Sequence, residues 1–273
     1  MPTLYLVGTP IGNLEDVSLR ALRTLREVSL IAAEDTRITR RLLERYEIKT
    51  RLVSFYEYSS SGRVEDLLLM LEEGDIALVS DAGMPGLSDP GYRMIQACIQ
   101  AGLKIVPIPG PSAAITALVV SGLPAENFLF LGFLPRRKKP RREALANIAG
   151  LPYTIVVFEA PHRLISLLGD IGEILGNRRL CIGREMTKMH EELWRGFVVD
   201  AIEYFEQGEI RGEFTLAIAG AVDGIWEETT VIDALVDERE RGASRKEAAE
   251  VVAGLSGWKK RDLYKLSLSL DKD

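Results

Sequence analysis

Three loops rich in glycine and proline each follow an apolar segment in the N-terminal half of the chain. They span Val7–Leu14, Ser80–Gly91 and Pro107–Ala113. Glycine allows positive φ angles and close backbone approach, and proline fixes the shape of a turn. In an open parallel sheet, ligands bind at the carboxyl ends of the strands, where the chain order reverses. One such loop is common as a plain turn, but three together favour a ligand site.

The kind of ligand follows from what these loops lack and from the carboxylate of Asp81. Neither GxGxxG nor GxxxxGK followed by Ser or Thr occurs, so the dinucleotide fingerprint and the P-loop are both absent. The second loop carries Asp81, whereas a phosphate-rich ligand would require cations and free amides. A backbone-rich site with one carboxylate suits a zwitterionic or cationic ligand that has ribose hydroxyls and a flat base.

Alternating apolar and amphipathic segments must position these loops. The rhythm of strand and helix predicts a parallel sheet covered by helices on both faces, and near-continuously apolar strands are typical of such a sheet. The predicted strands are Thr3–Gly8, Val28–Ala33, Arg51–Tyr56, Ile76–Ser80 and Lys104–Ile108. The predicted helices are Ser18–Glu27, Thr36–Tyr46, Gly62–Glu73, Tyr92–Ala101 and Ser112–Ser121.

The pattern changes near residue 122, and a second α/β domain with a mixed sheet is predicted from there to residue 224. Its predicted strands are Phe128–Phe133, Tyr153–Phe158, Arg178–Arg184, Leu193–Val199 and Glu213–Ala219, with one helix ending near Ala149 and another over Arg163–Leu175. Residues 225–273 are predicted as a helical module of helix-turn-helix type, with helices Thr229–Arg241, Ser244–Ala253 and Lys259–Leu268. Ser244 and Glu247 form a capping-box pattern. The predicted domains are therefore 1–122, 123–224 and 225–273.

Composition excludes several classes of protein. The 273 residues are 47% apolar with a net charge of −6, which predicts a folded core rather than a disordered chain. Two distant cysteines, Cys98 and Cys181, and two histidines, His162 and His190, exclude a disulfide scaffold and make a metal centre improbable. The N-terminus shows no signal-peptide pattern, and prolines interrupt the uncharged run Ile105–Ala125. We expect a cytoplasmic protein with no membrane segment.

Six motifs in order resemble one family. They are LYLVGTPIGNLED, AAEDTR, SDAGMPGLSDPG, PGPSA, FEAPHR and REMTK. Together they resemble the tetrapyrrole methylase superfamily, and within it the branch that methylates ribosomal RNA. The resemblance runs from about Leu4 to Ala219, and the helical tail resembles the C-terminal extension found in that branch.

The resemblance implies the architecture and the cofactor. It implies two α/β domains of tetrapyrrole-methylase type, one with a parallel and one with a mixed sheet, plus the helical module. S-adenosylmethionine is expected between the two domains of a homodimer. The residues expected to bind it are Gly8, Pro10, Asp81, Gly83, Met84, Ser112 and Ala113 in the first domain and Ala160 and Ala217 in the second.

The implied reaction is methyl transfer to the 2′-hydroxyl of a cytidine in 16S ribosomal RNA. Alignment of oxygen, methyl carbon and sulfur favours such a displacement, and a general base or charged partner activates the hydroxyl. Candidates at strand ends are Asp35, Glu159, His162 and Lys188. Asp35 is equally interpreted as a helix N-cap with a salt bridge, and a lone histidine at a helix start is more often structural or bound to phosphate, so no single base is selected.

Binding of RNA requires cations on the protein. The negative net charge of the chain does not exclude such binding, since the local distribution of charge governs it. Pro135–Arg142 has six cations in eight residues and no acid, and is interpreted either as an RNA-binding loop or as a merely solvated one. The predicted RNA-binding residues are Arg37, Arg136, Arg137, Lys138, Lys139, Arg163 and Arg184. Cations and two aromatics, Trp258 and Tyr264, in the helical module favour either RNA contact or simple core packing.

Two rival functions remain open at this level. A methyltransferase acting on a tetrapyrrole would not require the basic segment or the charged tail. A catalytically silent ribosome-binding module would not require intact glycine-proline loops or Asp81. The basic segment and the charged tail therefore argue against the first rival, and the glycine-proline loops with Asp81 argue against the second. Together they favour an S-adenosylmethionine-dependent RNA methyltransferase that acts on the small ribosomal subunit and contains no metal.

Overall fold

The computed structural model describes residues 2–55, 61–87, 91–221 and 228–270. The chain divides into two compact units, each with its own sheet. Unit 1 comprises Met1–Thr116 with Glu185–Glu192, and unit 2 comprises Ala117–Arg184 with Leu193–Asp273. The predicted α/β fold, with a parallel first sheet, a mixed second sheet and C-terminal helices, is confirmed. The division at residues 122 and 224 stays a prediction.

Unit 1 is a parallel sheet of five strands in the order β3-β2-β4-β1-β5. The strands are β1 (Thr3–Val7), β2 (Leu30–Ala33), β3 (Arg51–Ser54), β4 (Ile76–Val79) and β5 (Lys104–Ile108). The helices are η1 (Leu14–Asp16), α1 (Leu19–Glu27), α2 (Thr36–Arg45), α3 (Ser61–Glu73), α4 (Tyr92–Gln100) and α5 (Ala113–Ser121), whose second half belongs to unit 2. Because β1 lies between β4 and β5, the three glycine-proline loops leave adjacent strands.

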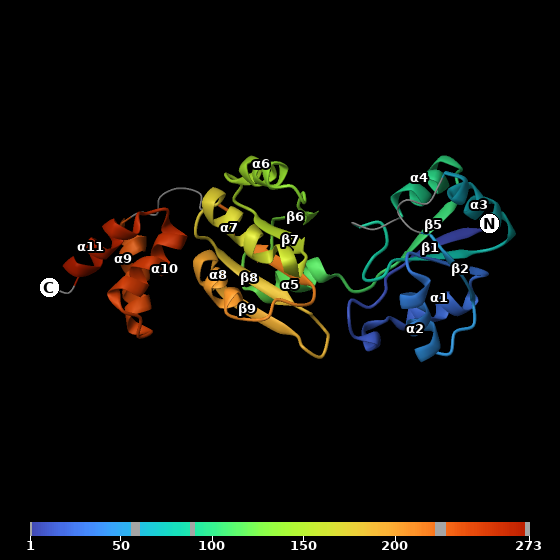
Figure 1. The fold of residues 1–273 in the computed structure, drawn as a ribbon, viewed down its shortest axis with the longest axis horizontal. Coiled ribbons are helices and arrows are strands. Elements are labelled where there is room, and N and C mark those ends of the chain that lie inside the picture. Colours follow the sequence, from blue (N-terminus) through green and yellow to red (C-terminus); the bar gives the residue numbers. More distant parts are fainter. Residues whose placement is uncertain (1, 56–60, 88–90, 222–227, 271–273) are drawn as a thin grey trace. The chain divides into compact units, whose positions relative to one another are not determined.

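Successive residues of a strand direct their side chains to opposite faces of this sheet. In β2, Ile31 and Ala33 pack with α1 and α2, whereas Leu30 and Ala32 pack with α3 and α4. Figure 1 shows α1 and α2 on one face of the sheet and α3 and α4 on the other. The continuous apolar pattern of the strands is thus explained by burial on both faces.

Unit 2 contains a mixed sheet in the order β6-β7-β10-β8-β9, with β6 parallel to β7 and β10 antiparallel to β7 and β8. Its strands are β6 (Phe128–Phe133), β7 (Thr154–Glu159), β8 (Arg179–Arg184), β9 (Glu192–Phe197) and β10 (Phe214–Ile218). Its helices around the sheet are α6 (Lys138–Ile148), η2 (Pro161–Arg163), α7 (Leu164–Ile174) and α8 (Val198–Glu206).

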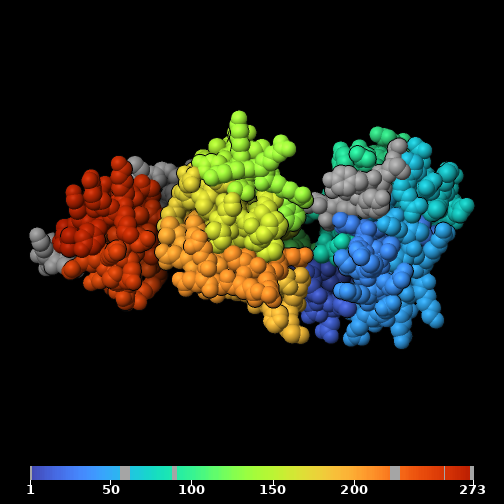
Figure 2. Space-filling view, viewed as in Figure 1, coloured from blue at the N-terminus to red at the C-terminus, as the bar shows by residue number. Residues whose placement is uncertain are grey.

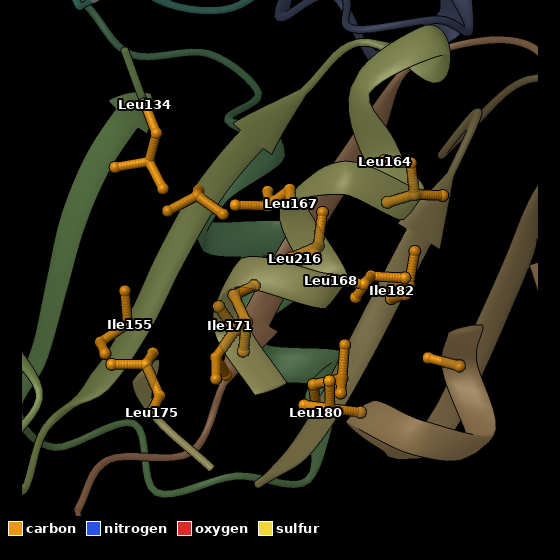
Figure 3. Packing of buried hydrophobic residues seen from close by; sticks show 14 of the residues in the cluster. Leu134, Ile155, Leu164, Leu167, Leu168, Ile171, Leu175, Leu180, Ile182 and Leu216 are labelled. Carbon is orange, nitrogen blue, oxygen red and sulfur yellow. The ribbon is translucent and has the colours of Figure 1, made fainter. Parts of the chain in front are cut away.

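The core of unit 2 lies between this sheet and helices α6 to α8. Figure 3 shows Leu164, Leu167, Leu168 and Ile171 of α7 facing the strand residues Ile155, Leu180, Ile182 and Leu216. These side chains are all buried, at roughly 1.5–3 kcal/mol each. The packing fixes α7, and with it the η2 turn that precedes it, against the end of β7.

Three helices form the C-terminal part of the described chain: α9 (Glu228–Glu240), α10 (Arg245–Ser256) and α11 (Lys260–Ser269). They share a small core that includes Val231, Leu235, Val252 and Leu263. The predicted capping box is confirmed, since Ser244 Oγ accepts from the Glu247 N–H and the Glu247 carboxylate accepts from the Ser244 N–H.

Two sequence predictions about elements were wrong. No helix was predicted after the strand at Leu193–Val199, yet α8 begins at Val198. The basic run is not wholly a loop, because α6 begins within it at Lys138. The predicted strand end at Tyr56 and residues 88–90 of the second glycine-proline loop lie outside the described residues.

Candidate active site

The three glycine-proline loops of unit 1 meet through backbone hydrogen bonds. The Gly8 N–H donates to the Ile108 carbonyl at 3.0 Å, which joins the first loop to the third. Thr9 and Gly83 exchange two bonds of 2.9 and 3.1 Å, which joins the first loop to the second. The loops therefore form one continuous surface at the carboxyl end of the sheet.

Glycine is required where the loops touch. A Cβ on Gly8 would lie 2.6 Å from Gly110 Cα and 2.7 Å from Met84 Sδ. A Cβ on Gly110 would lie 2.7 Å from Gly8 Cα. Gly83 has a φ of +78°, which favours glycine. The site is consequently walled by backbone, with Pro10 buried beside it.

Asp81 is the half-buried carboxylate of this site. Its Oδ1 accepts a hydrogen bond of 2.9 Å from the Asp35 N–H, and its own N–H donates to the Glu34 carboxylate at 3.3 Å. Burial raises the pKa of Asp81, and the nearby Asp35 carboxylate adds to the rise, while the Asp35 N–H and Arg37 oppose it. A cationic or hydroxyl-rich ligand would relieve this cost of burial.

Asp35 serves as the N-cap of α2. Its Oδ1 accepts from the Arg37 N–H at 2.8 Å, and the Arg37 guanidinium binds both of its oxygens. These hydrogen bonds lower the pKa of Asp35 to about 2. Asp35 therefore acts both as a helix cap and as a partner in an ion pair. Arg37, the other partner, is 88% exposed.

The remaining predicted residues of unit 1 lie around the same loops. Ser112 accepts through its carbonyl from the Thr116 N–H at 2.9 Å and precedes Ala113, the first residue of α5. Lys188 forms an ion pair with Glu185 at 2.9 Å. A Cβ on Gly12 would lie 2.6 Å from Lys188 Cγ, so Lys188 packs against the loop that follows β1.

Sequence reasoning missed Asn13 and Thr187. The Asn13 N–H donates to Thr187 Oγ1 at 3.0 Å, although 174 positions separate the two residues. No spacing in the sequence signals this bond, since the contact depends on the path of the whole chain. It adds the segment Glu185–Glu192 to the surroundings of the glycine-proline loops.

The other predicted catalytic residues belong to unit 2. Glu159 ends β7 and is 2% exposed; its Oε1 accepts from the Ala160 N–H at 2.8 Å and lies 3.1 Å from Arg163 Nε. Burial raises the pKa of Glu159, opposed by that N–H and by Arg163. His162 is exposed in the η2 turn, Ala160 is half-buried, and Ala217 is buried in β10.

The predicted RNA-binding cations differ in how they are engaged. Arg163 donates to the carbonyls of Leu134 and Pro135 at 2.9 and 3.2 Å. Arg184 donates to the carbonyls of Glu209 and Arg211. The four side chains at 136–139 are exposed and form no ion pair with any residue in the described parts of the chain. Figure 2 shows the yellow-green segment that contains α6 at the surface of its unit.

Two arginines of the basic run are structural. Arg141 is 3% exposed and lies 2.5 Å from Asp170, which is equally buried. Arg142 also binds Asp170, at 3.0 Å, and binds Glu173. The six cations predicted as one loop are therefore divided into four exposed ones and two that attach α6 to α7.

Comparison with known proteins assigns this architecture to a family. The model of the tetrapyrrole (corrin/porphyrin) methylases matches residues 3–201. The chain belongs to this family. It is accordingly an S-adenosylmethionine-dependent methyltransferase, which confirms the predicted enzyme class and cofactor.

Relatives within the family cover most of the chain. Ribosomal RNA small subunit methyltransferase I of Halalkalibacterium halodurans is 46% identical over 97% of this chain and 94% of its own. The protein of the same name from Thermotoga maritima is 51% identical over 81% of this chain and 99% of its own. The structure of uroporphyrin-III-C-methyltransferase from Thermus thermophilus has a TM-score of 0.56 at 21% identity, covering 80% of this chain and 94% of its own, and shows the shared fold.

The residues of the loops fit the methyl donor of this family. A side chain at Gly8 or Gly110 would occupy the junction of the loops, so the surface there is backbone, and Asp81 adds one half-buried carboxylate. An ammonium group and ribose hydroxyls are suitable partners for such a surface. Within the described ranges, no group of His, Cys, Asp and Glu could hold a metal ion. No helix in the described parts of the chain is both long and apolar enough to cross a membrane.

Proposed function

We propose that the chain methylates the 2′-hydroxyl of a cytidine in 16S ribosomal RNA within the small ribosomal subunit. The observation that carries this proposal is the 46% identity, over 97% of the chain, to a relative named ribosomal RNA small subunit methyltransferase I. The motifs of the sequence support the choice of acceptor atom and nucleotide, because they resemble that branch. By the same resemblance, the enzyme acts in the cytoplasm as a homodimer.

The RNA contact is assigned to the exposed cations at 136–139. Phosphate groups dominate RNA affinity, and these four side chains have no acidic partner within the described residues. They are held in place on both sides, by Arg163 at Leu134 and Pro135 and by the buried Arg141–Asp170 pair. We assign the RNA contact to this part of unit 2, where the four cations follow β6 and begin α6.

The methyl donor is assigned to the glycine-proline loops, and it supplies an electrophilic methyl group on a positively charged sulfur. Gly8, Pro10, Gly83, Met84, Ser112 and Ala113 would provide the surrounding surface, and Asp81 would bind the amino-acid or ribose part. Ala160 and Ala217 in unit 2 stay predictions as contacts of the adenine. The enzyme's contribution is to hold the acceptor hydroxyl in line with the methyl group.

The proton of the acceptor hydroxyl requires a base, and the four candidates differ in suitability. Asp35 is a poor one, because a carboxylate with a pKa of about 2 has little affinity for a proton near neutral pH. The Glu159 side chain is fully buried and bound to Arg163. Lys188 is paired with Glu185 and better suits charge stabilisation. We propose the exposed His162 as the proton acceptor, since histidine is the commonest general base.

Small ribosomal subunits that lack the modification provide the test. They are incubated with the enzyme and isotope-labelled S-adenosylmethionine, and the RNA is digested to nucleosides for mass spectrometry. Label in 2′-O-methylcytidine is the expected result. Absence of label, with cofactor binding intact, would redirect the proposal to a tetrapyrrole or another small acceptor. Absence of both label and cofactor binding would favour a silent ribosome-binding module.

A further inference from the structure

The segment Glu185–Glu192 packs as part of unit 1, although it connects β8 and β9 of unit 2. It meets the loop after β1 at Gly12 and Asn13. A Cβ on Gly12 would lie 2.6 Å from Thr187 Oγ1 and 2.9 Å from the Met186 carbonyl oxygen. The Asn13 N–H donates to Thr187 Oγ1 at 3.0 Å. A side chain at Gly12 would therefore displace both side-chain and backbone atoms of this segment.

The backbone of this segment is strained at two positions. Glu185 and Thr187 have φ angles of 49° and 65°, and a β-branched residue rarely adopts a positive φ. Hydrogen bonds around the turn maintain this conformation: the Thr187 N–H donates to the Glu191 carboxylate at 2.6 Å, and the Lys188 N–H donates to the Glu185 carbonyl at 3.0 Å. Strained conformations persist only where surrounding contacts hold them in place, and they cluster at functional sites.

The strain has a structural consequence at the Thr187 side chain. Glycine would adopt a φ of 65° more easily than threonine. Threonine supplies what glycine lacks, a hydroxyl that accepts the Asn13 N–H. The turn thus presents a fixed acceptor to the backbone of the loop after β1, and that loop continues directly into the residues that meet Gly83 and Gly110.

We infer that Thr187 is a positioning residue for the methyl-donor site: its hydroxyl, held by the strained turn, fixes Gly12–Asn13 and thereby the backbone of residues 8–11. The inference rests on the proposed assignment of the donor to the glycine-proline loops. Thr187 itself acts through Asn13 and the loop backbone.

Three variants of Thr187 separate the hydroxyl from the strain. Thr187→Val keeps the shape without the acceptor, Thr187→Gly relieves the strain without the acceptor, and Thr187→Ser keeps the acceptor. Hydrogen–deuterium exchange of the Asn13 amide, measured without cofactor, and calorimetric affinity for S-adenosylmethionine are the two readouts. Val and Gly should accelerate exchange and weaken affinity, each by about two- to tenfold, as expected for one hydrogen bond. Ser should restore both to wild-type values.

Two glycine-to-alanine variants extend the test, one at the contact and one elsewhere as a matched control. Gly12→Ala should act in the same direction as Thr187→Val, because its Cβ would meet backbone and side-chain atoms of Met186 and Thr187. Gly169→Ala in α7 should leave both readouts unchanged, because nothing lies within 4 Å of its Cβ. Thermal unfolding of each cofactor-free variant identifies variants that lose affinity merely by unfolding.

The outcomes distinguish this inference from the proposed function. Wild-type affinity in Thr187→Val, with affinity reduced in Asp81→Ala, would overturn the inference while supporting the donor site. Weakened affinity in Thr187→Val that Thr187→Ser does not restore would also overturn it, since the hydroxyl would not be the cause. Unchanged affinity in both Asp81→Ala and Gly12→Ala would contradict the donor site at these loops, and the inference with it.

Discussion

The guanidinium of Arg141 and the carboxylate of Asp170 form a buried ion pair at 2.5 Å that fastens the first turn of α6 to α7. Arg141 Nε donates to Asp170 Oδ2 at 2.7 Å, and its Nη2 donates to Ser166 Oγ at 2.7 Å. A buried pair of this kind contributes little more stability than well-packed apolar side chains. Its geometric effect is to hold the exposed cations at 136–139 at a defined position.

Removing one partner of this pair should destabilise the protein strongly. Arg141→Met leaves the buried Asp170 carboxylate without its closest partner, so the free energy of unfolding should fall by about 3–5 kcal/mol. Arg142→Met, at a partly exposed residue, should cost about 1 kcal/mol or less. Urea denaturation of both variants measures the difference. Equal decreases would show that Asp170 relies on Arg142 as much as on Arg141.

Neutralising the exposed cations should weaken RNA binding without affecting the cofactor. Replacing Arg136, Arg137, Lys138 and Lys139 by glutamine should reduce affinity for the small subunit. For each phosphate that is no longer bound, the plot of log affinity against log salt should also become shallower by about 0.7–0.9. Arg20 and Arg23 on α1, also exposed, replaced together by glutamine, serve as the control. An unchanged salt slope in the four-residue variant would remove this surface from the RNA-binding site.

Asp81 should contribute its charge to cofactor affinity. Asp81→Asn keeps an oxygen to accept from the Asp35 N–H but removes the charge, whereas Asp81→Ala removes both. Each should weaken S-adenosylmethionine binding by about 1.5–3 kcal/mol, the value of a hydrogen bond to a charged group. Asp66→Asn on α3 is the control for a carboxylate elsewhere in unit 1. Calorimetry that finds wild-type affinity in Asp81→Asn would exclude a charge contact.

The sequence was sufficient to predict the parallel sheet, because strands buried on both faces show near-continuous apolar runs and the helices between them are amphipathic. It was also sufficient to bring the glycine-proline loops together, since β4, β1 and β5 are neighbours with their carboxyl ends at one edge. The pairing of Asn13 with Thr187 could not be predicted, because it joins segments far apart in the chain.

The sequence contains a helical signal for each of the two elements that differ from the prediction. Arg141, Leu145 and Ile148 are spaced four and three residues apart, so they share the buried face of α6. That spacing predicts that Arg141 points inward and is paired. Val198, Ala201 and Phe205 show the same helical spacing in α8. The segment from Leu193 to Val199, apolar apart from Arg195 and Gly196, nevertheless resembles one continuous strand.

Asp35 should make the protein more sensitive to acid. Its pKa falls from 3.8 to about 2 on folding because Arg37 donates hydrogen bonds to the ionised carboxylate. A depressed carboxyl pKa stabilises the fold above the unfolded value, and that stabilisation is lost as pH falls through the folded value. Asp35→Asn keeps a good N-cap residue and removes the titrating group.

The stability difference between wild type and Asp35→Asn should therefore be constant above about pH 4–5 and shrink toward pH 2. Urea midpoints measured at a series of pH values test this. Asp81→Asn should show the opposite trend, because burial raises the Asp81 pKa, so ionisation of Asp81 costs stability as pH rises above 3.8. A difference for Asp35→Asn that stays flat from about pH 5 to about pH 2 would mean that Arg37 does not hold the carboxylate in solution. The argument that a low pKa makes Asp35 unsuitable as the general base would then no longer hold.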